Sequence, residues 1–234
     1  MSSVNNIPVF KCSMCGSCCR MSPISILPHE EVILRKLAEY MEINVVFTNG
    51  YTVYEAVNGV NIAFSYIMHL DESGKCPFQK GVLCSIHGVY KPYICRSFPY
   101  IPRHVKYHID DENKYIMATT DYGLSTACPV VKKDRPLLEE AEALHGGPVE
   151  KILIHYYKDG YWTAVEMDNA RALMLDLLSR LWQTGVIDIK PANKPGITVN
   201  LYEFLRRYYP DLPQRLGVDL VYRKVKTWLQ TYYS

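Results

Sequence analysis

The sequence has no long apolar run, no marked excess of either charge and, after Cys128, no cysteine. No apolar stretch reaches the roughly 20 residues that a membrane-spanning helix needs. Residues 1–8 also lack the basic segment and following apolar run that mark a signal peptide. These absences predict a cytoplasmic protein that has no membrane partner.

The balance of charge argues against a nucleic-acid partner. The 234 residues include 26 Lys and Arg and 24 Asp and Glu, so the net charge is only +2. A charged fraction of 21% and a hydrophobic fraction of 48% are typical of a globular protein. This length is enough for one large domain or two small ones.

Familiar catalytic motifs are missing too. The chain has no Gly-x-Gly-x-Gly turn after a strand, no phosphate-binding loop and no serine–histidine–aspartate order. The basic stretch from Arg103 to His108 is more typical of a solvated strand face than of an anion site. These patterns leave open whether the protein is an enzyme.

What the sequence does have is cysteine, concentrated in its first 128 residues. The eight are Cys12, Cys15, Cys18, Cys19, Cys76, Cys84, Cys95 and Cys128. Thiols are normally reduced in the cytoplasm, so these residues are expected to bind metal rather than to pair. Disulfides stay an alternative, because cytosolic proteins of hyperthermophiles are often rich in them.

The spacing of the thiols suits more than one metal centre. Cys12, Cys15 and Cys18 follow each other at intervals of three, as at the start of a ferredoxin-type iron–sulfur motif. The side chains of the neighbours Cys18 and Cys19 are expected to diverge, so these two residues could reach different centres. One [4Fe–4S] cluster and two tetrahedral zinc sites therefore both remain possible. His87 lies three residues after Cys84, where it is either a further ligand or an ordinary structural histidine.

Periodicity predicts an α+β fold whose helices follow the thiols. A helix is expected over residues 25–41, and two Asn-Gly pairs predict a meander of three strands over 45–70. Residues 76–99 are expected to be irregular with turns, and 100–109 with 115–120 to form a hairpin. Further helices are expected over 136–144, 148–158 (ending at Gly160), 165–184, 199–208 and 218–232.

These elements predict two domains. Residues 1–130 would form an irregular, cysteine-rich metal-binding domain with short hairpins, because they carry every thiol. Residues 131–234 would form a helical domain, whose surface is a candidate site for a protein partner.

In the order and spacing of its cysteines, the sequence resembles the YkgJ-type cysteine-cluster family, which is described as chelating zinc or iron. The resemblance covers about residues 10–130 and rests on four ordered blocks. They are Cys12-Ser-Met-Cys15-Gly-Ser-Cys18-Cys19-Arg20, Gly74-Lys-Cys76-Pro-Phe78, Cys84-Ser-Ile-His87 and Lys91-Pro-Tyr-Ile-Cys95-Arg96-Ser-Phe98-Pro99. Two positions depart from the family pattern: His87 stands where tyrosine is common, and Lys91 where arginine is common.

The resemblance implies metal binding, for which all eight cysteines are the candidate ligands, and leaves the reaction open. A related cysteine cluster occurs in flagellin lysine-N-methylase, which implies an S-adenosylmethionine-dependent protein lysine methylase as one alternative. A redox enzyme that uses the cluster is another alternative, and a zinc-stabilised interaction module is a third. The expected function is to hold an iron–sulfur cluster, of [4Fe–4S] type, or zinc.

Residues beside the thiols are candidates for supporting the cofactor. Arg20 follows the first thiol block and Arg96 follows Cys95, so either guanidinium could offset the charge of the thiolates and lower their pKa values. The alternative for each arginine is an ordinary ion pair or a surface position. Phe78 and Phe98 are expected to shield the site from water.

Overall fold

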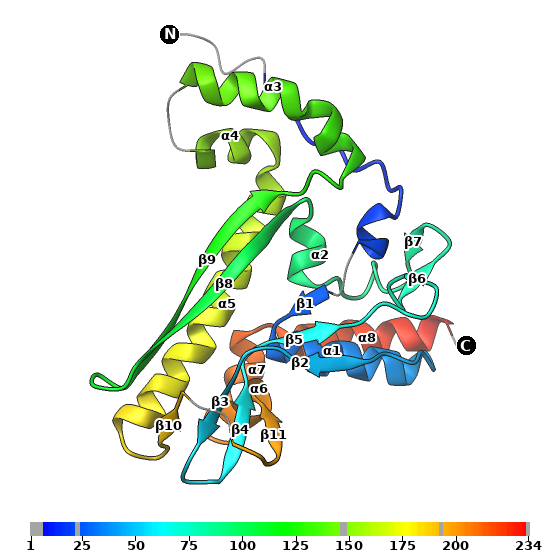
Figure 1. The fold of residues 1–234 in the computed structure, drawn as a ribbon. Helices are drawn as coiled ribbons and strands as arrows, with labels where there is room; N and C mark the ends of the chain where they lie inside the picture. Colours follow the sequence, from blue (N-terminus) through cyan, green and yellow to red (C-terminus); the bar gives the residue numbers. More distant parts are fainter. Residues whose placement is uncertain (1–6, 22–23, 146–148, 192–193, 233–234) are drawn as a thin grey trace.

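The computed structural model describes residues 7–21, 24–145, 149–191 and 194–232, and it has the expected α+β fold. Figure 1 shows a long hairpin lying along a long helix, with small sheets and shorter helices at one end of the pair and further helices at the other end. No helix in the described part of the chain is both long enough and apolar enough to cross a membrane.

The first sheet includes residues that were expected to form the start of a helix. Strands β1 (Ile24–Ile26), β2 (Phe47–Asn49) and β5 (Tyr66–Met68) form a sheet in the order β1-β5-β2, and helix α1 spans Pro28–Tyr40. Pro28 occupies the first turn of α1, where its missing N–H is tolerated. Ser25 and Ile26, which were expected in the helix, therefore belong to β1, and Leu27 caps the helix.

The predicted meander is wrong. Strands β3 (Thr52–Glu55) and β4 (Val60–Ala63) do form a hairpin, but β2 pairs with β5 and not with β3. The expected long strand over 60–70 is divided between β4 and β5, which belong to two different sheets. The division falls at Ser65, whose carbonyl accepts a hydrogen bond of 2.8 Å from the backbone N–H of Gly50. The Asn-Gly pairs therefore mark turns correctly but do not say which strands become neighbours.

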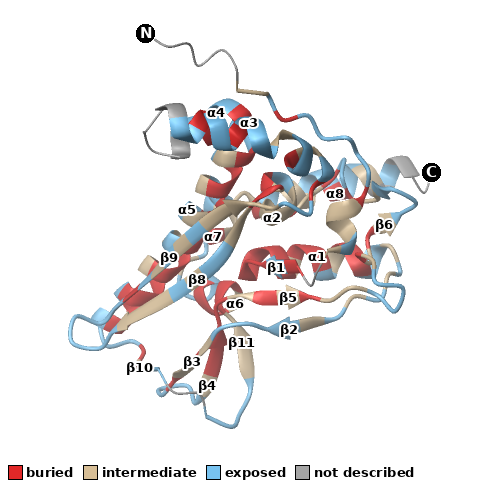
Figure 2. Cartoon of the chain, turned by 45° about the horizontal axis from the view of Figure 1, so that its top comes forward, coloured by how far each residue is buried: buried red, intermediate tan, exposed pale blue. Residues whose placement is uncertain are grey.

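The C-terminal half completes the second sheet. Strands β10 (Ile189–Lys190) and β11 (Thr198–Asn200) flank β3 and β4, so the order is β10-β3-β4-β11. Figure 2 shows buried residues running through α1, β4, β5 and α5. The main core accordingly takes residues such as Ile33 and Met68 from one half and Met174 and Leu205 from the other. The division into domains at residue 130 stays a prediction.

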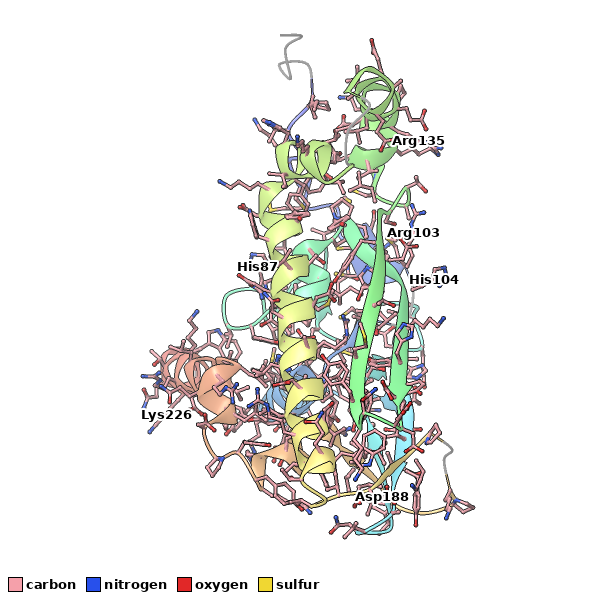
Figure 3. All side chains as sticks on the ribbon, turned by 90° about the vertical axis from the view of Figure 1, so that its left-hand side faces the viewer. His87, Arg103, His104, Arg135, Asp188 and Lys226 are labelled. Carbon is pink, nitrogen blue, oxygen red and sulfur yellow. The ribbon has the colours of Figure 1, made fainter. Side chains whose placement is uncertain are left out.

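The segment between the sheets and the long hairpin carries three of the thiols. It contains the two-residue strands β6 (Gln79–Lys80) and β7 (Leu83–Cys84) and the helix α2 (Tyr93–Ser97), with turns between them. The irregular character expected for 76–99 is thus interrupted by a short helix. The hairpin of β8 (Tyr100–Asp110) and β9 (Tyr115–Leu124) is confirmed. Figure 3 shows it alongside α5, with the exposed Arg103 and His104 on its outer side.

The helices after the hairpin are α3 (Pro129–His145), α4 (Val149–Tyr156), α5 (Lys158–Gln183), α6 (Leu201–Arg206), α7 (Leu212–Arg215) and α8 (Val218–Tyr232). The prediction that Gly160 ends a helix is wrong, because Gly160 lies in the first turn of α5. A Cβ atom there would lie 2.0 Å from the ring of Tyr157, so the glycine permits close packing rather than a turn.

Candidate metal centre

The first thiol block folds back onto the second through backbone contacts. Cys18 and Cys19 lie on the 3₁₀ helix η2 (Ser17–Arg20), which Figure 1 shows in dark blue beside β6, β7 and α2. Gly16 caps this helix with a φ of +70°, and a Cβ atom on it would lie 3.0 Å from the carbonyl oxygen of Val82. The backbone N–H of Cys76 donates a 2.7 Å hydrogen bond to the carbonyl of Cys19.

Most of the thiols line one cavity. Its volume is about 230 Å³, and Phe10, Phe98, His87 and Lys91 are also in its wall. The thiols that line it are Cys12, Cys15, Cys18, Cys19, Cys84 and Cys128. Cys95 and Cys18 together line a second, smaller cavity of about 60 Å³.

Five of the thiols, Cys18, Cys19, Cys76, Cys84 and Cys95, form what we call the inner group, because their charges act on one another. The Sγ atoms of Cys18 and Cys19 are 3.9 Å apart. The hydrogen bond from the Cys19 thiol lowers the pKa of Cys18 to about 6, while the same bond and burial raise the pKa of Cys19. Cys18 is therefore the member of the inner group most readily present as a thiolate, the form that binds metal.

Burial dominates the other members of the inner group. It raises the pKa of Cys76 to about 11 and the pKa of Cys95 well above its ordinary value. Burial raises the pKa of Cys84 as well. The ammonium group of Lys91 acts in the opposite direction on Cys18, Cys84 and Cys95.

The remaining three thiols, Cys12, Cys15 and Cys128, lie around the rim of the larger cavity. Cys12 and Cys15 are exposed, whereas Cys128 is buried in a second apolar cluster that includes Phe10. The Sγ of Cys15 is 3.1 Å from the Oγ of Ser17, and this hydrogen bond lowers the pKa of Cys15. Cys12 and Cys15 thus share the cavity with the inner group without sharing its burial, whereas Cys128 is as buried as Cys76.

Helix α2, which carries Cys95, is held in place by a buried carboxylate. Glu30 accepts hydrogen bonds from the backbone N–H of Tyr93 at 2.7 Å and from the hydroxyl of Tyr90 at 2.9 Å. Its other oxygen accepts a 3.0 Å bond from the N–H of Leu27. Burial raises the pKa of Glu30, and these bonds offset part of that increase. One side chain thus joins the start of α1 to the thiol-bearing helix.

Unlike Lys91, the two candidate arginines are not in the wall of the larger cavity. Arg96 forms an ion pair with Glu166 on α5 at 3.4 Å, and its guanidinium lies 4.7 Å from the ring centre of Tyr93. Arg20 is exposed at the end of η2. The cation with the largest effect on the pKa values of the thiols is Lys91, so the supporting roles of the arginines stay predictions.

His87 and the two phenylalanines occupy different parts of the site. His87 is exposed and lines the larger cavity, and its role as a ligand stays a prediction. Phe98 lines both cavities, in agreement with a shielding role. Phe78, by contrast, is fully buried in the main core.

Sequence reasoning missed Lys91 and Glu30. The departure of Lys91 from the family's arginine was a usable signal, and so was the position of Glu30 in the first turn of a helix after a proline. Neither signal says that the side chain reaches a thiol segment, because those contacts join residues far apart in the sequence.

The donor chemistry of the site fits a soft metal. All eight cysteines are free thiols, and thiolates are the ligands that zinc and iron–sulfur clusters take. In the described ranges, no three His, Cys, Asp or Glu side chains already lie together as a metal ion requires. Metal binding therefore requires the thiols around the cavity to converge.

These features define an α+β protein with a thiol-lined site that segments from Cys12 to Cys128 build together. A model of the CxxCxxCC family, described as a "putative zinc- or iron-chelating domain", matches residues 11–129, just over half of the 234 residues. The chain belongs to this family, and the description supports binding of zinc or iron. No curated protein matches the chain. No solved structure matches it either.

Proposed function

We propose that the protein binds an iron–sulfur cluster, of [4Fe–4S] type, in the site that its eight cysteines build, with zinc as the alternative. The observation that carries this proposal is the cavity of about 230 Å³ with six thiols in its wall. Zinc in a structural site holds four ligands at about 2.0–2.3 Å and needs no space beyond them. A cavity of this size suits a group of several atoms better than a single ion.

The surroundings of the cavity also suit a cluster. Phe10 and Phe98 lie in its wall and limit the access of water, which affects the potential of an iron–sulfur cluster. Lys91 contributes a positive charge that offsets part of the negative charge of the thiolates. A bound cluster would supply one-electron chemistry, whereas bound zinc would crosslink the thiol segments.

The alternative of a zinc-stabilised interaction module has its own observation in its favour. A groove of about 570 Å³ lies between α1 and α8. Its lining residues include Tyr40, Tyr222 and Val225, with Lys36 and Lys226 beside them. A protein partner of the helical part would bind there. Methyl transfer and redox catalysis rest on the family resemblance alone.

We also propose that the protein works in the cytoplasm without a nucleic-acid or membrane partner. Eight free thiols are compatible with a compartment that keeps thiols reduced. The near balance of 26 basic and 24 acidic residues supports the absence of a nucleic-acid partner.

Anaerobic purification followed by metal analysis and a visible spectrum tests the proposal. We expect brown protein that contains iron and acid-labile sulfide. Colourless protein with bound zinc would establish the zinc alternative instead. Protein that takes up neither metal after anaerobic reconstitution would contradict both forms of the proposal.

A further inference from the structure

The eight thiols differ sharply in how accessible they are. Cys12 and Cys15 are exposed, whereas Cys76 is buried and Cys84 and Cys95 are partly buried against the main core. Metal held by the inner group would thus be separated from solvent by protein. The exposed pair lies on the wall of the same cavity, where an incoming metal meets thiols first.

The segment that carries this exposed pair, residues 10–16, is anchored at both ends. At one end the backbone N–H of Phe10 donates a 2.6 Å hydrogen bond to the carbonyl of Tyr156, and the ring of Phe10 packs on Tyr157. At the other end Gly16 is buried against Val82. The two thiols are thus presented between fixed points rather than on a free terminus.

Exposed apolar side chains lie on the same segment as the pair and in the wall of the same cavity. Val9 and Met14 are each 67% exposed, and Val82 and Leu83 across the cavity are 54% and 58% exposed. Side chains of this kind stand in water only at a cost, and a cluster of them around a site is typical of a docking surface.

The charge of the same segments is of one sign. Residues 1–29 and 73–109 contain eight Lys and Arg and no Asp or Glu, although the whole chain is nearly neutral. Lys11, Lys80 and Lys91 belong to these segments, and Lys91 lines the cavity itself. A positive rim repels a bare divalent cation and attracts an anion.

We propose that Cys12 and Cys15 form a metal-exchange edge, which accepts metal from an anionic carrier complex and passes it to the inner group. The proposal rests on the metal-binding function proposed above. In the exchange, a thiolate of the edge forms a bond to the metal as one carrier ligand leaves with its electron pair. Any thiol proton passes to the leaving ligand or to water, and no atom changes oxidation state.

Loading of metal-free protein with cobalt citrate tests the edge, because Co²⁺–thiolate absorption reports each metal–sulfur bond as it forms. We expect the Cys12→Ser/Cys15→Ser variant to load about tenfold or more slowly and yet to bind Co²⁺ at the inner group. The Cys84→Ser/Cys95→Ser variant should lose the final complex. Val57→Ala, at an exposed apolar residue between β3 and β4 that does not line the cavity, is the control and should load as the unchanged protein does.

A charge variant tests the carrier. Lys11→Glu/Lys80→Glu should slow loading from cobalt citrate roughly tenfold, the scale of electrostatic steering, and should not slow loading from aqueous Co²⁺. Loading of the Cys12→Ser/Cys15→Ser variant at the unchanged rate, or loss of its final complex, would overturn the exchange edge. Equal effects of the charge variant on both cobalt sources would overturn the anionic carrier. If the unchanged protein binds no metal from any source, the proposed function itself fails.

Discussion

At the scale of single residues, the site depends on one lysine that acts on several thiols. Lys91 comes four residues before Cys95 in the sequence and lies in the cavity wall together with Cys18 and Cys84. Its positive charge favours the thiolate form of all three. Because a thiolate is the form that binds metal, this lysine favours metal binding by Cys18 and offsets part of the increase that burial causes in the pKa values of Cys84 and Cys95.

Replacement of Lys91 should shift the titration of Cys18. In Lys91→Met protein free of metal, we expect the pKa of Cys18 to rise from about 6 by roughly one unit, because a nearby positive charge is lost while the bond from Cys19 remains. The pH dependence of alkylation at Cys18, followed by mass spectrometry, measures this shift. Lys80→Met, at an exposed lysine on β6, is the matched control. An unchanged midpoint in Lys91→Met would show that the cation does not act on the thiol.

At the scale of elements, a left-handed residue decides where the first thiol block lies. Gly16 has a φ of +70° and caps η2, so that Cys18 and Cys19 turn toward the segment of Cys76 and Cys84. An L-residue pays about 1–2 kcal/mol in this conformation. At Gly16 the neighbouring backbone is also close to the position of a side chain, since a Cβ atom would lie 3.0 Å from the carbonyl oxygen of Val82.

Gly16→Ala should therefore destabilise the protein more than the same substitution at an equally strained glycine elsewhere. Gly74 has nearly the same φ, +71°, and has no heavy atom within 4 Å of its Cβ position, so Gly74→Ala is a matched control. We expect Gly16→Ala to lose about 1 kcal/mol or more of unfolding free energy beyond the loss in Gly74→Ala, because of the added overlap. Urea denaturation measures both. Equal losses in the two variants would contradict the close approach.

At the scale of the whole molecule, a buried histidine lies where the two halves of the chain meet. His29 is 1% exposed, and its ring centre lies 5.9 Å from that of Tyr93 and 6.4 Å from that of Tyr202. Neither Nδ1 of His29 nor the hydroxyl of Tyr202 has a hydrogen-bond partner in the described structure. Burial lowers the pKa of His29 to about 3, from an ordinary value of 6.5.

This shift makes the folded protein sensitive to acid. Since the folded pKa lies below the unfolded one, the stabilisation is present above pH 6.5 and is lost as the pH falls toward 3. Relative to His29→Phe, we expect the unfolding free energy of the unchanged protein to fall by about 1.4 kcal/mol for each pH unit below 6.5. Urea denaturation of both proteins at several pH values measures the difference. The exposed His104→Phe is the control, and parallel curves for His29→Phe and the unchanged protein would refute the expectation.

Local pattern predicted some elements well and others poorly, for an identifiable reason. The hairpin of β8 and β9 and helix α8 have their own turn residues and their own repeating apolar positions, so they can be read from neighbouring residues. The meander over 45–70 failed because β2 finds β5 as its partner, and because β10 and β11 arrive from more than a hundred residues later. No local turn signal specifies which strands pair when they are so far apart in the sequence.

The sequence by itself determined the fold class, the family and the candidate ligands, because thiol spacing and hydrophobic period are properties of neighbouring residues. Only the tertiary structure decided which thiols form the inner group and which lie at the exposed edge, since burial depends on the packing of distant segments. The same holds for Lys91 and Glu30. Their charges are visible in the sequence, but a charge acts through distance in space, and only the fold sets that distance.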